Sequence, residues 1–171
     1  FQKNILSLIK SAKQYSNFVR IDMESSKVTD DTISVYKDIS KEYLNFGLVF
    51  QSYLFRTFND IKEIDLNNFN FRLCKGIYNE SDRVAYQDRN EINQNYLKIL
   101  DYALSNKIYI GIATHDEYLL EESYKLIEKH SAKPDKFEFQ ALYGVPLEKW
   151  HQRHFKNNYN VRLYLPFGDD W

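Results

Sequence analysis

Short runs rich in apolar and aromatic residues recur along the chain and predict β-strands, and in several of them apolar and polar residues alternate. We expect strands at 17–23, 45–53, 68–76, 107–113, 136–142 and 160–166. Between several of them, apolar residues recur every three or four positions, which predicts amphipathic helices at 30–44, 91–105 and 116–130. Thr29 is the expected N-cap of the first helix. Strands that alternate with helices at this spacing are typical of a parallel α/β sheet.

One face of the predicted strands is polar, whereas fully buried parallel strands normally read as continuous apolar runs. Arg20 and Asp22 alternate with Val19 and Ile21, and Arg72 interrupts the apolar stretch "FRLC". Burying such charges without partners would cost several kcal/mol each. They must therefore contact one another, water or a polar ligand, and α/β folds place ligand sites at the C-terminal ends of their strands. The alternative is an internal salt-bridge network, for example Asp22 with Arg72.

Two of the predicted strand ends carry groups that suit a phosphate. Lys75 and Gly76 follow the third strand, where an ammonium can meet an anion and a glycine lets a ligand approach the backbone. The stretch "ATHDE" (113–117) leads from a strand into a helix N-terminus and offers donors from Thr114, His115 and the backbone. Neither stretch has the spacing of a Walker loop, and the chain contains no G-x-G-x-x-G.

Composition and charge are those of an ordinary globular domain and argue against several kinds of partner and site. The 171 residues are 43% hydrophobic and 27% charged, as in ordinary globular domains. A net charge of −1 argues against a nucleic-acid partner. The single cysteine, Cys74, excludes an intrachain disulfide. His151 and His154 have a spacing that is common by chance on a helix, so we expect no metal site.

Six stretches occur in one order and with compatible spacing between Phe18 and Trp171: "VRIDMESS", "VFQSYLFRT", "FRLCKGIYNE", "IATHDE", "FEFQALYGV" and "VRLYLPFGDDW". Together they resemble the FAD-dependent proline dehydrogenases of the bacterial single-function type. The resemblance implies an α/β fold, a (β/α)8 TIM-like barrel, with FAD over the C-terminal ends of its strands. Residues 1–171 would form a single partial barrel domain that contains the third to the eighth strand.

The resemblance also implies roles for individual residues. Asp22 would be an active-site acid, and Arg72 would stabilise negative charge on the flavin as hydride arrives. Tyr143 would border the proline pocket. The residues that would contact FAD are Met23 and Gln51 at the ring system, Lys75, Gly76 and Ile77 along the ribityl and pyrophosphate groups, Thr114 and His115 at the pyrophosphate, and Gln140.

The implied reaction oxidises L-proline to 1-pyrroline-5-carboxylate, the first step of proline catabolism, and passes the electrons through FAD to a membrane quinone. The resemblance implies a cytoplasmic protein, either free or peripheral at the inner face of the membrane. In this family an arginine pair and a lysine that bind the substrate lie on segments not found between Phe1 and Trp171. We therefore expect a piece of a longer protein that is inactive alone. Nothing in the sequence favours one oligomeric state.

Two further hypotheses use the same residues. One is a non-flavin α/β-barrel lyase or phosphodiesterase that binds a phosphate at Lys75 and Thr114. The other is an inactive barrel fragment that serves as an interaction piece. Flavin absorption by the purified full-length protein separates the dehydrogenase from both.

Overall fold

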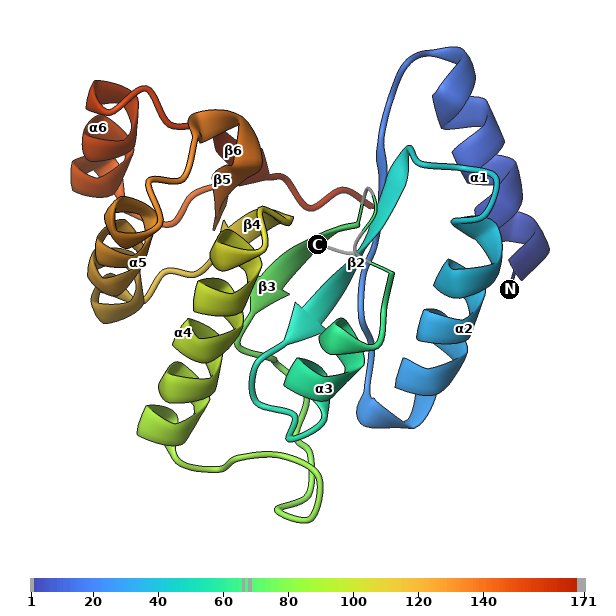
Figure 1. The fold of residues 1–171 in the computed structure, drawn as a ribbon, viewed down its shortest axis with the longest axis horizontal. Coiled ribbons are helices and arrows are strands. Elements are labelled where there is room, and N and C mark those ends of the chain that lie inside the picture. Colours follow the sequence, from blue (N-terminus) through green and yellow to red (C-terminus); the bar gives the residue numbers. More distant parts are fainter. Residues whose placement is uncertain (1, 66, 68, 169–171) are drawn as a thin grey trace.

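Six parallel strands form one curled sheet in which each strand pairs with its neighbours in chain order (Figure 1). The computed structural model describes residues 2–65, 67 and 69–168. The strands are β1 (Val19–Ile21), β2 (Phe46–Gln51), β3 (Asn70–Cys74), β4 (Tyr109–Ala113), β5 (Phe137–Leu142) and β6 (Val161–Tyr164). Parallel neighbours in sequential order are the arrangement of a TIM-like barrel, so the predicted fold class is confirmed for a curled half-barrel.

Helices connect the strands and lie on the outer side of the curved sheet (Figure 1). They are α1 (Gln2–Gln14), α2 (Thr29–Ile39), α3 (Thr57–Lys62), α4 (Arg89–Ser105), α5 (Glu117–Lys129) and α6 (Glu148–Lys156). Two short 3-10 turns, η1 (Ser26–Val28) and η2 (Pro134–Lys136), precede α2 and β5. In the described part of the chain, no helix combines the length and the apolar character that crossing a membrane requires.

The helix predicted at 30–44 is shorter than expected and ends at Ile39. The chain then turns so that the Asn45 amide donates to a carbonyl in α1 at 3.1 Å, a contact that a continued helix would prevent. Thr29 was predicted as the N-cap, but it is the first residue of the helix, because Val28 at the end of η1 occupies the cap position.

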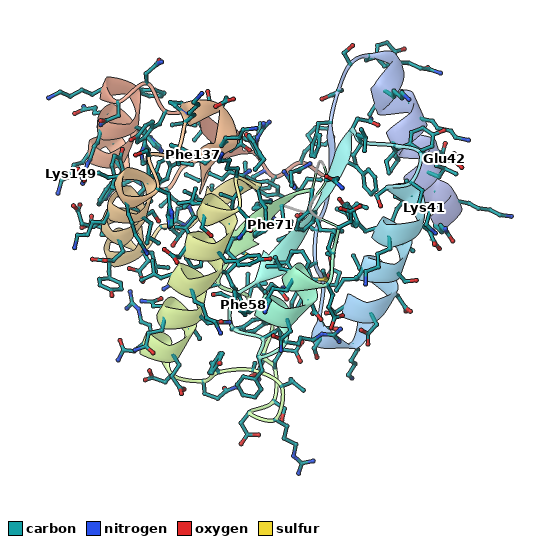
Figure 2. All side chains as sticks on the ribbon, in the orientation of Figure 1. Lys41, Glu42, Phe58, Phe71, Phe137 and Lys149 are labelled. Atoms are coloured by element: carbon teal, nitrogen blue, oxygen red, sulfur yellow. The ribbon has the colours of Figure 1, made fainter. Side chains whose placement is uncertain are left out.

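The apolar core lies between the outer face of the sheet and the helices. In β3, Phe71 and Leu73 are fully buried, whereas the alternate residues Asn70, Arg72 and Cys74 are only partly buried on the concave face. Figure 2 labels Phe71 and Phe137, which belong to this core. Each large apolar side chain buried in this way stabilises the fold by about 2 kcal/mol.

Glycines on the concave face make room for large polar side chains on the neighbouring strands. A Cβ atom on Gly47 would lie 2.4 Å from Nη1 of Arg20, and one on Gly111 would lie 2.6 Å from Nε2 of Gln140. Both distances are shorter than any van der Waals contact. The polar concave face therefore depends on small residues of β2 and β4 as well as on the charged ones.

Candidate active site

A cavity of about 670 Å³ opens at the C-terminal ends of the strands. The predicted site residues that line it are Asp22, Met23, Gln51, Arg72, Lys75, Gly76, Ile77, Thr114, His115 and Gln140. The structure therefore brings together side chains from the ends of five strands. Tyr143 follows β5, is 65% exposed, and is not among the lining residues, so its role at the proline pocket stays a prediction.

Arg72 projects from the middle of β3 into this cavity and is held on two sides. Its Nη2 donates to Oδ1 of Asp22 at 2.6 Å, and its guanidinium carbon lies 5.4 Å from the centre of the Tyr164 ring. A carboxylate and an aromatic face together fix a planar guanidinium. The internal salt bridge expected as an alternative is thus present, but it forms part of the cavity wall rather than closing the face.

Gln51 leaves one buried polar atom unpaired at the end of β2. Its Nε2 donates to the carbonyl of Met23 at 3.2 Å, while its Oε1 is buried and accepts no hydrogen bond from the described residues. An unsatisfied buried acceptor costs about 1–3 kcal/mol. Because Gln51 lines the cavity, an N–H group of a bound ligand would remove this cost.

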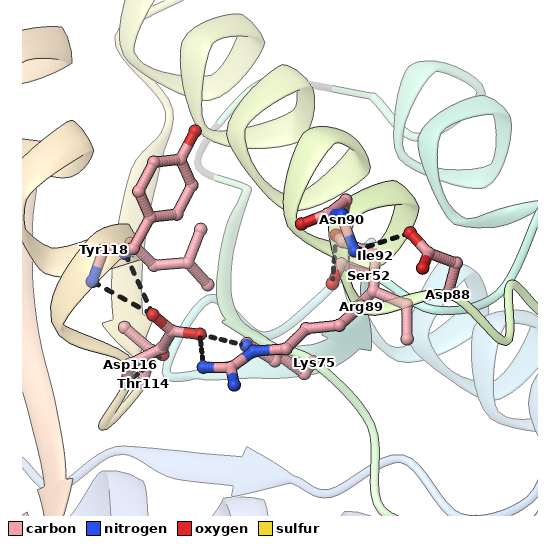
Figure 3. A network of polar contacts seen from close by, with 10 residues as sticks. Ser52, Lys75, Asp88, Arg89, Asn90, Ile92, Thr114, Asp116 and Tyr118 are labelled. Atoms are coloured by element: carbon pink, nitrogen blue, oxygen red, sulfur yellow. Dashed lines mark hydrogen bonds and ion pairs between the residues drawn. The ribbon is translucent and has the colours of Figure 1, made fainter.

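Lys75 and Arg89 share one buried acid beside the cavity (Figure 3). Lys75 Nζ lies 2.5 Å and Arg89 Nη2 lies 2.8 Å from Oδ2 of Asp116, whose other oxygen caps α5 by accepting from the backbone N–H groups of Tyr118 and Leu119. Burial acts to raise the pKa of Asp116, but the hydrogen bonds from Lys75 and Arg89 outweigh it and hold that pKa well below its usual range. Lys75 and Arg89 carry two positive charges and Asp116 one negative charge, so the cluster keeps a net positive charge that can bind an anion.

Thr114 and His115 lie at the end of β4 beside this cluster. The Thr114 hydroxyl oxygen accepts from the backbone N–H of Asp116 at 3.1 Å. Nε2 of His115 accepts from the backbone N–H of Leu142 at 2.9 Å, which places the proton of the neutral ring on Nδ1. Partial burial lowers the pKa of His115 and favours this neutral form.

Backbone conformation and packing require a glycine at position 76, which the sequence did not indicate. Its φ is +120°, and a Cβ atom would lie 2.4 Å from the Tyr53 ring, so packing against that ring requires glycine here. The chain beyond it exposes 87% of Ile77 at the cavity mouth. The Tyr78 hydroxyl then donates to the carboxylate of Glu24, which joins the loops after β1 and β3.

Sequence reasoning missed Arg89 as a member of the site. No motif marks it: it comes from the start of α4, lines the cavity and donates a hydrogen bond to Asp116. The capping role of Asp116 could have been predicted from the sequence, since an acid directly before a helix is a preferred N-cap. Its pairing with Lys75 joins residues 41 positions apart and depends on the fold.

Comparisons with known proteins agree with this geometry. The family model for proline dehydrogenase matches residues 3–170. Proline dehydrogenase 2 of Bacillus subtilis (strain 168) is 38% identical over 169 residues, which are 99% of this chain and 55% of that protein. The proline dehydrogenase of Deinococcus radiodurans is 35% identical over 170 residues, covering 98% of this chain and 54% of that protein. The chain thus spans about half the length of these curated relatives.

Solved structures show the same fold. Proline utilization A from Bdellovibrio bacteriovorus superposes with a TM-score of 0.88 at 26% identity, covering 99% of this chain and 20% of that protein. A variant of proline utilization A from Bradyrhizobium japonicum gives a TM-score of 0.84 at 21% identity, over 98% of this chain and 19% of that protein, and supports the fold alone. Because the family model covers nearly the whole chain, the chain belongs to the proline dehydrogenase family.

Proposed function

We propose that the protein is an FAD-dependent proline dehydrogenase that oxidises L-proline to 1-pyrroline-5-carboxylate and passes the electrons to a membrane quinone. The observation that carries the proposal is the cavity at the C-terminal ends of the strands, where the Asp22–Arg72 pair and Lys75 converge. Family membership favours this activity over a lyase or a phosphodiesterase. We expect a cytoplasmic protein, either free or peripheral at the inner face of the membrane.

The residues present fit FAD. The unpaired carbonyl of Gln51 suits the imide N–H of an isoalloxazine ring, and the buried side chain of Met23 offers it an apolar surface. Lys75 and Arg89, neutralised only in part by Asp116, suit a diphosphate. When bound, FAD supplies the acceptor for the hydride that proline loses.

Arg72 and Asp22 would act on the reacting groups. Arg72 is clamped between a carboxylate and an aromatic ring, so its charge is fixed before any negative charge develops beside it. Asp22 uses only Oδ1 in that clamp, and its side chain, which lines the cavity, is 43% exposed. Its second oxygen can therefore bind the amine of the substrate.

Purification of the full-length protein tests the proposal. We expect visible flavin absorption, and reduction of a soluble quinone that depends on L-proline. Asp22→Asn should lower that turnover by at least about a hundredfold, because it removes the acid at the reacting centre. Asp31→Asn is the matched control, since Asp31 is an exposed acid on α2 away from the cavity. A folded protein without flavin or without turnover would contradict the proposal and favour the inactive interaction piece.

A further inference from the structure

The loop after β3 carries part of the cavity wall, and its first half has little backbone support. The loop comprises residues 75–88, between β3 and α4. Its second half is held by backbone hydrogen bonds of 2.8 and 3.0 Å between 84–86 and 53–55. Among the described residues, no backbone–backbone hydrogen bond holds 76–80. Side chains must therefore fix this stretch, which includes two of the residues that line the cavity beyond Lys75.

Glu80 ties this stretch to the loop after β1. Its Oε1 accepts from the backbone N–H of Ser26 at 2.6 Å, and its Oε2 accepts from the hydroxyl of the same residue at 2.7 Å. Ser26 is the first residue of η1, where a backbone N–H has no partner inside the helix, and the side chain of Ser25 makes no capping bond. The bonds from the N–H and the hydroxyl lower the pKa of Glu80, so its carboxylate is ionised at neutral pH and both bonds are charge-assisted.

Two other contacts of the same stretch hold it less firmly. The Tyr78 hydroxyl donates to Glu24, but both side chains are exposed, so water competes for this bond. Gly76 packs against the Tyr53 ring, which fixes only the start of the stretch. Of these three contacts, the one made by Glu80 alone combines two short charge-assisted bonds with partial burial.

The bond between Glu80 and Ser26 joins two walls of the cavity. Residues 22–24 of the loop after β1 and 75–78 of the loop after β3 line the cavity, whereas Ser26 and Glu80 follow them closely in sequence and do not line it. Ile77 lines the cavity although 87% of it is exposed. A ligand that covers Ile77 therefore gains apolar contact only while the loop keeps its place.

We propose that Glu80 is a positioning residue for the cofactor: its bond to Ser26 holds the loops after β1 and β3 in the places from which Met23 and Ile77 contact FAD, and so slows the dissociation of FAD. The inference rests on the proposed function, because it requires FAD in the cavity. Without the bond, each binding event would have to order residues 76–80, and that entropy cost weakens binding.

Two measurements on the full-length protein test the inference. Amide hydrogen exchange of the FAD-free protein reports the order of residues 76–80, and flavin fluorescence follows the binding and release of FAD. Glu80→Ala should speed exchange in this stretch and raise the dissociation constant of FAD about tenfold, mainly through faster release. Ser26→Ala removes the hydroxyl but keeps the N–H, so it should raise the constant only about threefold. The double variant should bind FAD as Glu80→Ala does, because the hydroxyl acts only through Glu80.

Two further variants separate this role from general effects of charge and stability. Glutamine has the same length as glutamate, and its amide can accept from the N–H of Ser26 while it donates to the hydroxyl oxygen. Glu80→Gln should therefore keep FAD affinity within about threefold of the wild type. Asp82→Ala is the matched control, because Asp82 is an exposed acid of the same loop whose hydrogen bond from Ser81, at 3.2 Å, stays within the loop. Its FAD affinity and loop exchange should equal those of the wild type. Ser26→Ala provides the test if Glu80→Ala does not fold.

Three outcomes would overturn the inference: faster loop exchange in Glu80→Ala without weaker FAD binding, losses that simply add in the double variant, or a Glu80→Gln variant that binds FAD no better than Glu80→Ala. A lower melting temperature with an unchanged rate of FAD release would show that Glu80 serves stability alone. A wild-type protein that binds no FAD would overturn the proposed function as well. The two failures are therefore distinguishable by the wild-type titration.

Discussion

Arg72 is a guanidinium in the middle of a strand whose neighbours are fully buried, and its contacts explain how the fold tolerates it. The ion pair with Asp22 and the ring of Tyr164 satisfy the charge, while 18% of its side chain stays exposed in the cavity. A buried charge of this kind is costly unless it is paired. Strand alternation predicted that Arg72 and Asp22 share the polar face, and both line the cavity in the structure, while their catalytic roles stay predictions.

Arg72→Lys tests whether this arrangement serves catalysis. Lysine keeps the charge but lacks the planar fork that contacts Asp22 and covers the Tyr164 ring together. We expect proline turnover to fall about a hundredfold while FAD content is retained, as for loss of one charge-stabilising donor. Arg56→Lys is the control, because Arg56 pairs with Asp30 and Asp60 outside the cavity. Normal turnover in a folded Arg72→Ala variant would end the catalytic role.

The N-terminus of α5 organises the positively charged side of the cavity. Asp116 caps this helix and also accepts hydrogen bonds from Lys75 at the end of β3 and from Arg89 at the start of α4. One side chain thus joins three elements that are distant in sequence. Strand and helix patterns predicted each element, but the meeting of their ends follows from the register of the sheet, which no local pattern contains.

Asp116→Asn separates the cap from the ion pairs, because asparagine caps a helix about as well as aspartate. We expect a lower free energy of unfolding at neutral pH. The folded-state pKa of Asp116 lies below its usual 3.8, so the stability it adds is present above that pH and is lost as the pH falls through the folded-state pKa. The gap between variant and wild type should therefore narrow at about pH 3 and below. An equal gap at both pH values would contradict this account.

Helices α5 and α6 pack over β5 through a buried histidine. His154 is 2% exposed, its ring centre lies 3.9 Å from that of Phe139, and its Nδ1 lies 2.8 Å from the Tyr124 hydroxyl. Burial, with smaller contributions from His151 and Arg153, lowers the pKa of His154 from 6.5 to about 4. The folded state thus keeps the ring neutral.

This histidine predicts an acid sensitivity of the fold. The unfolded chain binds the proton near pH 6.5 and the folded chain only near pH 4, so stability is complete above 6.5 and declines as the pH falls toward 4. The decline should amount to about 3 kcal/mol. His154→Gln keeps a polar side chain but cannot titrate, so its stability should vary less across this range. Chemical denaturation at several pH values measures both slopes, and equal slopes would contradict the prediction.

Sequence patterns predicted some helices and strands better than others. The strands were found because short runs rich in apolar residues recur along the chain, several with alternating polar residues, and α4 and α5 were found because their apolar residues repeat over three or more turns. The six-residue helix α3 carries too few turns for such a pattern. The end of α2 was misplaced because Tyr43 and Leu44 continue the apolar period beyond Ile39, although Leu44 is 58% exposed.

At the scale of the whole molecule, the sheet has two edges. Among the described residues, β1 and β6 each pair on one side only, and β6 leads into Leu165 and Phe167, which are 66% and 97% exposed. Open strand edges beside apolar side chains promote association. We expect the isolated polypeptide 1–171 to self-associate or to unfold without a sharp transition. Sedimentation at several concentrations checks this, and a monomer with one cooperative melt would contradict it.

If the cavity at the strand ends holds a flavin, L-proline should reduce it. The most direct measurement is an anaerobic titration of the purified full-length protein with L-proline, followed by visible absorption. We expect the oxidised flavin bands to bleach with proline in the wild type, and to bleach far more slowly in Arg72→Lys. Flavin bands that L-proline leaves unchanged would contradict the assignment.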